Sequence, residues 1–406
     1  MTEHAGQPCY VLGIESQIGL SLIRELGAAG VPVVGIALSP DAIGLRSRFL
    51  TAGALLQAPR TAEGLQELRA LGERYGPGYL LTVSEANTSW LIDHQDDLGN
   101  LKALVPSRLA FEAVLDKEKT LALARKVGVD VPQSICPQSW DEVEATAATF
   151  PFPAVLKWAD PNGVAPQLEA FGLEYVKAEY VNSAAEFLSV ARRYRPLNTW
   201  PLLQEYCPGV GLGQFFFMHR GEAVRRFQHV RVAEWPPEGG FSSVCDAVPL
   251  NQFHDLQERS IALLKEIGWE GVAMVEYRYD SMSGRAVLME INGRYWGSFP
   301  LAMHSGAGFS LLSYALQGQG HMPTLPRQRD DIRCRMVATE LKRLVRIIAQ
   351  PGRIMDKRFR VRPLYELFRF AIDYLRPSVR YYVWRWDDPK PFFQDVMNAL
   401  GAGKQR

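Results

Sequence analysis

Residues 9–100 alternate short apolar runs with amphipathic stretches. Four of the runs are typical of buried strands: 9–14, 31–36, 50–56 and 79–83. Two stretches between them, 19–29 and 61–75, carry apolar residues at helical spacing. Strands that alternate with helices in this way predict a parallel, doubly wound sheet. We therefore expect an α/β domain over residues 1–105.

The pattern changes twice further along the chain. Residues 106–130 predict two short linker helices, with Asp116 as the N-cap of the second. From there to about residue 325 the pattern predicts strands with shorter helices, as in an α+β domain. We expect a first lobe at about 131–203 and a second at about 204–325, so that 106–325 form one domain. A break at Gly318–Pro323 precedes a basic, aromatic and mainly helical region over 326–406.

The N-terminal strand–helix pattern is typical of domains that bind dinucleotides. Gly13 and Gly19 flank a strand-to-helix turn, but the middle glycine of the GxGxxG fingerprint is absent. The second strand runs into Ile36–Ser39 without an acidic residue. The fingerprint therefore fails, and an NAD-dependent oxidoreductase is disfavoured.

The segment Val272–Gly293 predicts a hairpin that carries carboxylates. A turn centred on Ser283 places Glu276 opposite Glu290, and Asn292 then shares their face. Alternation gives the other, apolar face to these residues: Val275, Tyr277, Tyr279, Val287, Met289 and Ile291. Like charges directly opposite each other are destabilising, and bound Mg²⁺ would remove that repulsion. The alternative is a solvated polar face on which Arg278 neutralises Glu276.

Two lysines occupy positions where an anion would explain them. Lys157 lies within the apolar run Pro153–Trp158, and an amine in such a run needs an anionic partner. A phosphate would supply one, whereas a side chain that reaches to the surface is the alternative. Lys117 follows Asp116 at a predicted helix start, where solvation alone also accounts for it.

Further candidates lie on later strands. Arg231 precedes a Pro-Pro-Glu-Gly-Gly loop at 236–240, whose backbone could cradle an anionic substrate. Arg294 follows the carboxylate strand at once. A strand that ends at Gln204 and Glu205 could offer alternating backbone and carboxylate groups to an adenine edge, or it is simply an edge strand.

The order of these features resembles the ATP-grasp superfamily over about residues 8–320. It is most similar to carboxylate–amine ligases of the D-aspartate ligase group, and more distantly to D-alanine–D-alanine ligase and carbamoyl phosphate synthetase. The resemblance implies that Lys117 and Lys157 contact ATP phosphates. It implies an adenine-binding hinge at Gln204, Glu205, Tyr206 and Cys207. It implies Mg²⁺ ligands at Glu276, Glu290 and Asn292, with Arg294 and Arg231 as catalytic residues that meet the transferred phosphoryl group and the substrate anion.

The sequence departs from the family pattern in two places. The short glycine-rich lid expected after the strand lysine is replaced by a longer stretch from Asp160 to Gly172. The acidic residue expected for the ribose hydroxyls is absent from Gly211–Gln214, where Gln214 is the substitute we expect.

The resemblance implies an ADP-forming, ATP-dependent carboxylate–amine ligase that acts through an acyl phosphate. Its partners would be a small-molecule carboxylate and an amine, such as an amino acid and a cell-envelope precursor. Its cofactors would be ATP and Mg²⁺, with two ions expected and Mn²⁺ as the alternative metal. Other readings are an ATP-dependent carboxylate kinase, a thioester ligase, or a non-catalytic nucleotide-binding regulatory protein.

Composition narrows the setting. The chain has 406 residues, 47% of them hydrophobic, which excludes disorder. A net charge of +1 gives no nucleic-acid footprint, and we expect no such partner. No apolar run approaches the roughly 20 residues that span a bilayer, and Met1–His4 begin no secretory signal. Five scattered cysteines are typical of reduced thiols, so we expect a cytoplasmic protein.

The near-zero charge hides two opposed parts. Residues 331–406 hold 17 Lys and Arg against 8 Asp and Glu, which leaves 28 against 36 in residues 1–330. A basic, aromatic region could lie on the anionic inner face of a membrane. It could instead pack its aromatic side chains on the acidic body with its arginines outward. The sequence leaves both open, and it permits an oligomer.

Overall fold

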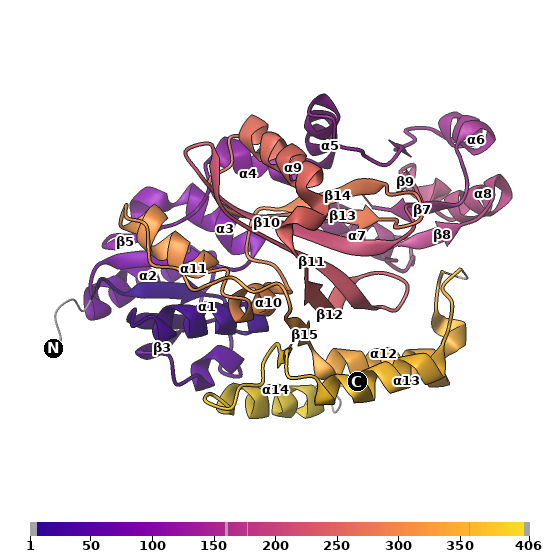
Figure 1. The fold of residues 1–406 in the computed structure, drawn as a ribbon. Coiled ribbons are helices and arrows are strands. Elements are labelled where there is room, and N and C mark those ends of the chain that lie inside the picture. The colour runs from indigo at the N-terminus through magenta and orange to yellow at the C-terminus, as the bar shows by residue number, and fades with distance from the viewer. Residues whose placement is uncertain (1–5, 159–160, 177, 357, 402–406) are drawn as a thin grey trace.

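The computed structural model describes residues 6–158, 161–176, 178–356 and 358–401. Within these ranges the strands form three sheets, arranged as an N-terminal layer, a first lobe and a second lobe (Figure 1). No helix in the described residues is long and apolar enough to cross a membrane. All five cysteines are free thiols.

The N-terminal sheet is parallel and doubly wound, as expected, with the strand order β3-β2-β1-β4-β5. Its strands are β1 (Cys9–Leu12), β2 (Val33–Ala37), β3 (Ala52–Leu55), β4 (Gly78–Thr82) and β5 (Leu101–Ala103). Its helices are α1 (Gln17–Ala28), α2 (Ala62–Tyr75) and α3 (Glu85–Asp93). Residues of β1 and β2 are buried on both faces, which explains their continuous apolar sequences.

The first lobe is an antiparallel sheet with the order β6-β9-β7-β8. The linker helices α4 (Arg108–Leu115) and α5 (Lys117–Lys126) precede it, and Asp116 caps α5 by accepting from the Lys119 N–H at 3.0 Å. The lobe comprises β6 (Ser134–Ile135), α6 (Trp140–Thr149), β7 (Ala154–Lys157), α7 (Pro161–Ala170), β8 (Glu179–Val181), α8 (Ala184–Arg193) and β9 (Leu202–Glu205). Helix α7 fills most of the expected lid; Asp160 lies outside the described residues. The lobe has a hydrophobic core of its own.

The second lobe is a seven-stranded sheet with the order β14-β13-β10-β11-β12-β15-β16. Its strands are β10 (Val210–His219), β11 (Glu222–Trp235), β12 (Phe241–Ala247), β13 (Gly271–Tyr279), β14 (Ala286–Asn292), β15 (Arg333–Arg335) and β16 (Val379–Tyr381). Its helices are α9 (His254–Ile267), α10 (Phe299–His304), α11 (Phe309–Leu311) and a π-helical turn, Leu312–Gly318. Its core is continuous with one face of the N-terminal sheet. These two parts therefore share a hydrophobic core, whereas the first lobe has its own.

The predicted hairpin is present with one irregularity. Glu276 pairs with Glu290 and Met274 with Asn292, as the turn position predicts. A bulge then shifts the register, so that Leu288 rather than Met289 pairs with Tyr277. Leu288 therefore joins the apolar core, and Val287 pairs with Arg278 on the other face. The expected apolar face was wrong at Val287 and Met289 because the extra residue reverses the alternation toward the turn.

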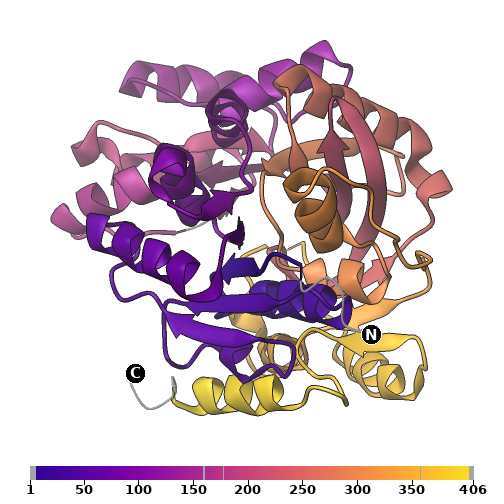
Figure 2. The same ribbon diagram turned by 90° about the vertical axis from the view of Figure 1, so that its left-hand side faces the viewer.

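The C-terminal region is not a separate helical unit. It contributes β15 and β16 to the edge of the second sheet and adds α12 (Val337–Ala349), α13 (Pro363–Ile372) and α14 (Lys390–Gly401). These helices lie along one edge of the molecule in both views (Figures 1 and 2). Arg335, Arg343 and Arg369 are buried in it. The expectation of arginines outward and aromatics inward was wrong at these positions, because each arginine pairs with a buried carboxylate.

Candidate active site

Glu276, Glu290 and Asn292 lie together on one face of the hairpin, which we call the carboxylate face. Glu276 lies opposite Glu290 on adjacent strands, and the Asn292 amide donates to Glu290 Oε1 at 3.1 Å. Burial raises the pKa of Glu276, and the charge of Glu290 adds to that rise, whereas Arg231 opposes it. The hairpin thus brings together three oxygen-bearing side chains at a place where ionising both carboxylates is unfavourable. Among the described residues, no three His, Cys, Asp or Glu side chains gather as a metal site, so an amide completes this donor set.

Arg231 neutralises this wall. Its Nη2 donates to Glu276 Oε2 at 2.6 Å and its Nη1 to Glu234 Oε1 at 3.1 Å. Gly211 makes room for it, because a Cβ there would lie 2.4 Å from Arg231 Cδ. Arg278 bonds to Glu234 at 3.1 Å instead. The alternative in which Arg278 neutralises Glu276 was therefore wrong, because the sheet order places β11 only one strand away from β13, and Arg231 reaches Glu276 across the glycines of β10.

Of the two predicted lysines, Lys157 lies within electrostatic reach of both Lys117 and the carboxylate face. Lys157 Nζ donates to Gln204 Oε1 at 3.0 Å. Burial lowers the pKa of Lys157, the nearby charge of Lys117 lowers it further, and Glu290 and Glu276 oppose this. Lys117 is exposed at the first turn of α5. Two amines and two carboxylates near one another are groups suited to hold a phosphate chain with its metal.

The predicted hinge connects β9 to β10. Glu205 Oε1 accepts from Arg285 Nη1 at 2.6 Å, and its Oε2 accepts from the Gln133 N–H at 3.1 Å. The Glu205 carboxylate thus ties the first lobe to the hairpin and is not free to meet an adenine edge. Cys207 is buried, and burial raises the pKa of its thiol to about 11. It is therefore a packing residue rather than a nucleophile.

Gln214 lies away from the carboxylate face. It is fully buried, and its Oε1 accepts from Ser260 Oγ of α9 at 2.7 Å. Its neighbours in β10 lie on the other face of the strand, because Gly213 pairs with Glu276 and a Cβ at Gly211 would lie 2.4 Å from Arg231 Cδ. Side-chain alternation thus separates Gln214 from Glu276, and the structure does not support its predicted contact with a ribose.

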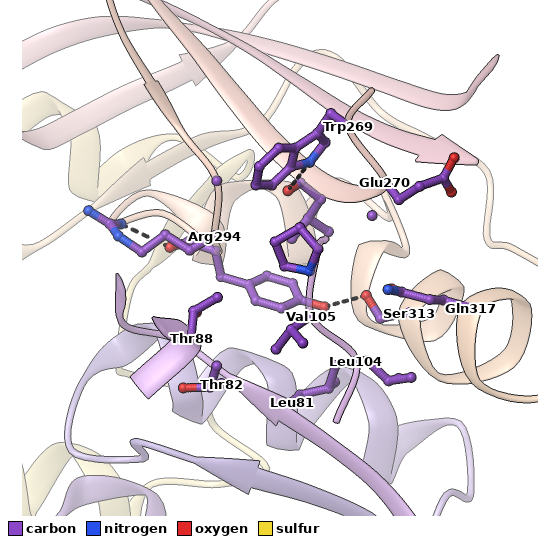
Figure 3. A pocket seen from close by; sticks show the side chains of 15 residues that line it. Leu81, Thr82, Thr88, Leu104, Val105, Trp269, Glu270, Arg294, Ser313 and Gln317 are labelled. Carbon is purple, nitrogen blue, oxygen red and sulfur yellow. Dashed lines mark hydrogen bonds between the residues drawn. The ribbon is translucent and has the colours of Figure 1, made fainter. Parts of the chain in front are cut away.

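Arg294 points toward the N-terminal part. Its Nε donates to Glu85 Oε1 at 3.0 Å, at the first turn of α3. Figure 3 shows it beside a cavity of about 30 Å³ that Thr82, Thr88 and Trp269 also line. That volume is about the space of one water molecule in the liquid. Arg294 therefore links the carboxylate strand to the junction of the two parts.

A larger cavity of about 280 Å³ opens beside the hinge, and we call it the arginine pocket. Its lining includes Arg231, Arg278, Arg343, Arg358, Arg360 and Tyr206. Three acidic residues also line it: Glu234, Glu238 and Asp356. It adjoins the carboxylate face, since Arg231 lines it and also donates to Glu276.

The C-terminal region supplies one wall of the arginine pocket. The Arg358 guanidinium carbon lies 3.5 Å from the centre of the Tyr206 ring, and its Nε donates to Asp356 Oδ1 at 2.8 Å. Its two terminal nitrogens are buried without a hydrogen-bond partner among the described residues. The Met355 N–H donates to Glu238 Oε1 at 2.9 Å, which fixes this segment to the loop after β11. Sequence reasoning missed these residues, and no local signal marks them.

Comparisons with known proteins agree with this geometry. Residues 245–320 match the family model of the carbamoyl-phosphate synthase L chain, ATP binding domain, and they include Glu276, Glu290, Asn292 and Arg294. A sequence search found no match among curated proteins.

Solved structures share the fold. Biotin carboxylase from Campylobacter jejuni superposes with a TM-score of 0.62 at 14% identity, over 81% of this chain and 75% of the other. L-amino acid ligase from Bacillus licheniformis gives 0.55 at 14%, over 77% and 74%. N5-carboxyaminoimidazole synthetase from Staphylococcus aureus gives 0.56 at 13%, over 79% and 78%. The resemblance stated from the sequence is therefore supported by a family-model match over residues 245–320 and by a fold shared with these structures.

Proposed function

We propose that this chain, which has the ATP-grasp fold, is an ADP-forming ligase that joins a carboxylate to an amine. The observation that carries the proposal is the carboxylate face, on which Glu276 pairs with Glu290 and Asn292 donates to Glu290, with Lys157 within electrostatic reach of both glutamates. The similar structures support it, since they include a ligase of amino acids and two enzymes of carboxylation chemistry.

The reaction would proceed in two steps. A substrate carboxylate oxygen attacks the γ-phosphorus of ATP, the bond to the bridging oxygen breaks, and ADP leaves. The acyl phosphate is then attacked by an amine nitrogen, which loses a proton as inorganic phosphate departs and an amide remains. Such chemistry requires positioning and charge neutralisation rather than a protein nucleophile. Lys117 and Lys157 would hold the phosphates, and Arg294 would stabilise the transferred group.

The residues present fit Mg²⁺. Arg231 and Arg278 bond to Glu276 and Glu234, which leaves Glu290 without a bonded arginine among the described residues. Oxygen donors from two carboxylates and an amide suit this hard cation. When bound, the metal would supply charge neutralisation at the phosphates. Glu276, Glu290 and Asn292 would hold it; Mn²⁺ is the alternative.

The arginine pocket indicates where the substrate binds. It adjoins Glu276 through Arg231, and five arginines outnumber three acidic residues in its lining. Guanidinium forks recognise carboxylates and phosphates. We therefore place an anionic small molecule there, held by Arg358 and Arg278. For adenine we keep the hinge at Gln204–Cys207, contacted through backbone groups rather than through the Glu205 carboxylate.

The test is ADP and phosphate release with a library of carboxylic acids and amino acids, in the presence and absence of Mg²⁺. We expect turnover that depends on both substrates and on Mg²⁺, and a loss of at least about a hundredfold in Glu290→Ala. Glu222→Ala is the matched control, since Glu222 is an exposed strand glutamate paired with Lys265. Turnover that survives Glu290→Ala would contradict the metal assignment.

Two other functions are separated by the same assay. An accumulating acyl phosphate, or a thioester in the mass spectrum of the product, would indicate a carboxylate kinase or a thioester ligase. Nucleotide binding without turnover of any substrate would indicate a regulatory protein. The intact set of Glu276, Glu290 and Asn292 favours a catalytic role over the latter.

A further inference from the structure

The three C-terminal helices are amphipathic, but their polar faces point into the protein and apolar side chains lie at the surface. In α13 the charged side chains Glu366 and Arg369 are buried, whereas Leu364 is 84% and Phe368 66% exposed. The buried charges bond to one another at 2.8 Å, and Arg343 of α12 donates to Glu366 at 2.6 Å. The helix thus satisfies its polar face inside the protein and presents its apolar face to the surroundings.

Helices α12 and α14 repeat this arrangement. In α12, Glu340 and Arg343 are buried while an apolar stripe faces outward. Trp386, just before α14, is 87% exposed. We call the exposed apolar residues of the three helices and their flanks the apolar platform: Leu341, Val345, Ile348, Leu364, Tyr365, Leu367, Phe368, Leu375, Trp386, Phe393, Val396, Met397 and Leu400. So many large apolar side chains on neighbouring helices exceed the scattered exposure normal for a protein surface.

The platform is one surface. Helices α12, α13 and α14 lie along the same edge of the molecule in two views at right angles (Figures 1 and 2). Helix α12 packs against α13, and the charge of Lys342 on α12 lowers the pKa of Asp395 on α14, against the larger effect of burial, which raises it, so α14 lies within electrostatic reach of α12. An extended edge of this kind suits a broad, flat partner.

Charge selects the partner. Exposed basic residues lie on the helices and at their ends: Lys342, Arg362, Arg376 and Lys390. The region as a whole carries 17 basic against 8 acidic residues. A second copy of the same surface would bring like charges together, whereas an anionic lipid headgroup layer would attract them. Aromatic and aliphatic side chains beside Lys and Arg are the composition of helices that lie in a bilayer interface.

We propose that the apolar platform docks this protein on the surface of an anionic lipid bilayer. The helices lie in the interface plane without crossing it, in keeping with their length. The inference does not depend on ligase activity, since no residue of the candidate active site belongs to the platform. If both hold, the arginine pocket, which Arg343 of α12 and Arg358 line, lies next to one of the docking helices.

The test is co-sedimentation of the full chain with vesicles, with Leu364→Glu/Phe368→Glu as the platform variant. Both side chains are exposed, so folding should survive, and circular dichroism checks this. Leu109→Glu/Met282→Glu is the matched control, since these residues are 78% and 94% exposed outside the platform. Vesicles of equimolar phosphatidylcholine and phosphatidylglycerol are compared with phosphatidylcholine alone, at low and high salt.

We expect the wild type and the control to pellet with the anionic vesicles, less so at high salt, and the platform variant to bind at least about tenfold more weakly. Absence of pelleting at low salt would overturn the proposal. Equal binding to neutral vesicles would overturn the requirement for anionic lipid. A dimer in analytical ultracentrifugation that the platform variant abolishes, without vesicle binding, would assign the surface to a second copy instead.

Discussion

Replacing Arg231 with methionine removes the cation that compensates a buried carboxylate. The Arg231 side chain is 10% and that of Glu276 14% exposed, and they are joined at 2.6 Å. Glu234 retains Arg278 at 3.1 Å, so Glu276 is the carboxylate left unpaired. Two unit charges about 4 Å apart interact by about 4 kcal/mol at an effective dielectric of 20. Removing one partner of a buried pair costs about 3–5 kcal/mol, which agrees.

We therefore expect Arg231→Met to lower the local free energy of opening by about 3–5 kcal/mol in the absence of Mg²⁺. Adding Glu276→Gln should restore most of the loss, because the uncompensated charge is removed. Mg²⁺ at about 100 times its Kd should restore about 2.7 kcal/mol to the single variant if Glu276 binds it.

Native-state hydrogen exchange of peptides from β11 and β13 measures this quantity directly. Lys265→Met is the matched control, because its pair with Glu222 is exposed and is expected to contribute under about 1 kcal/mol. An Arg231→Met variant within about 1 kcal/mol of wild type, or a double variant no more stable than the single, would refute the reasoning.

Three further predictions follow from buried charges. Burial raises the pKa of Glu276 above its ordinary 4.5, so Mg²⁺ affinity measured by calorimetry should begin to fall, as pH is lowered, while still above 4.5, and this early fall should be absent in Glu276→Gln. Because the pKa of Lys157 is lowered from 10.5 in the folded state, the stability of the wild type against urea should rise as the pH increases toward 10.5. Lys157→Met should lack this rise and be more stable than the wild type at neutral pH, yet bind ADP at least about tenfold more weakly. Arg335 and Glu340 are both fully buried and joined at 2.7 Å, so Arg335→Met should lose about 3–5 kcal/mol in urea unfolding, and Arg335→Met/Glu340→Leu much less.

The hairpin shows how far local rules reach. The turn residues and the alternation of polar and apolar positions predicted that Glu276 faces Glu290, and they do face each other. The bulge was not predictable in the same way. The Leu288 N–H donates to the Asp130 carbonyl at 2.8 Å, so a linker that is remote in sequence takes part in setting the register there.

Candidate residues were identified by type, but their partners were not. Arg231 was predicted to meet a substrate, yet its bond to Glu276 spans 45 positions and depends on which strands are neighbours. Gln214 was predicted to contact the ribose from its position in a motif, but it lies on the other face of β10 and accepts a hydrogen bond from Ser260. Arg358 carries no motif at all, and only the return of the C-terminal chain to the hinge brings it onto Tyr206.

The sequence by itself determined the α/β class, the linker helices, the carboxylate pair and the charge asymmetry between body and C-terminal region. These depend on side-chain periodicity, turn chemistry and composition, which act over a few residues. Only the tertiary structure decided which face of α13 is outside. Amphipathic periodicity predicts that one face is apolar, but the direction of that face depends on where the charged face finds partners. In this protein Glu366 finds Arg343 and Arg369 inside, and the apolar face is left at the surface.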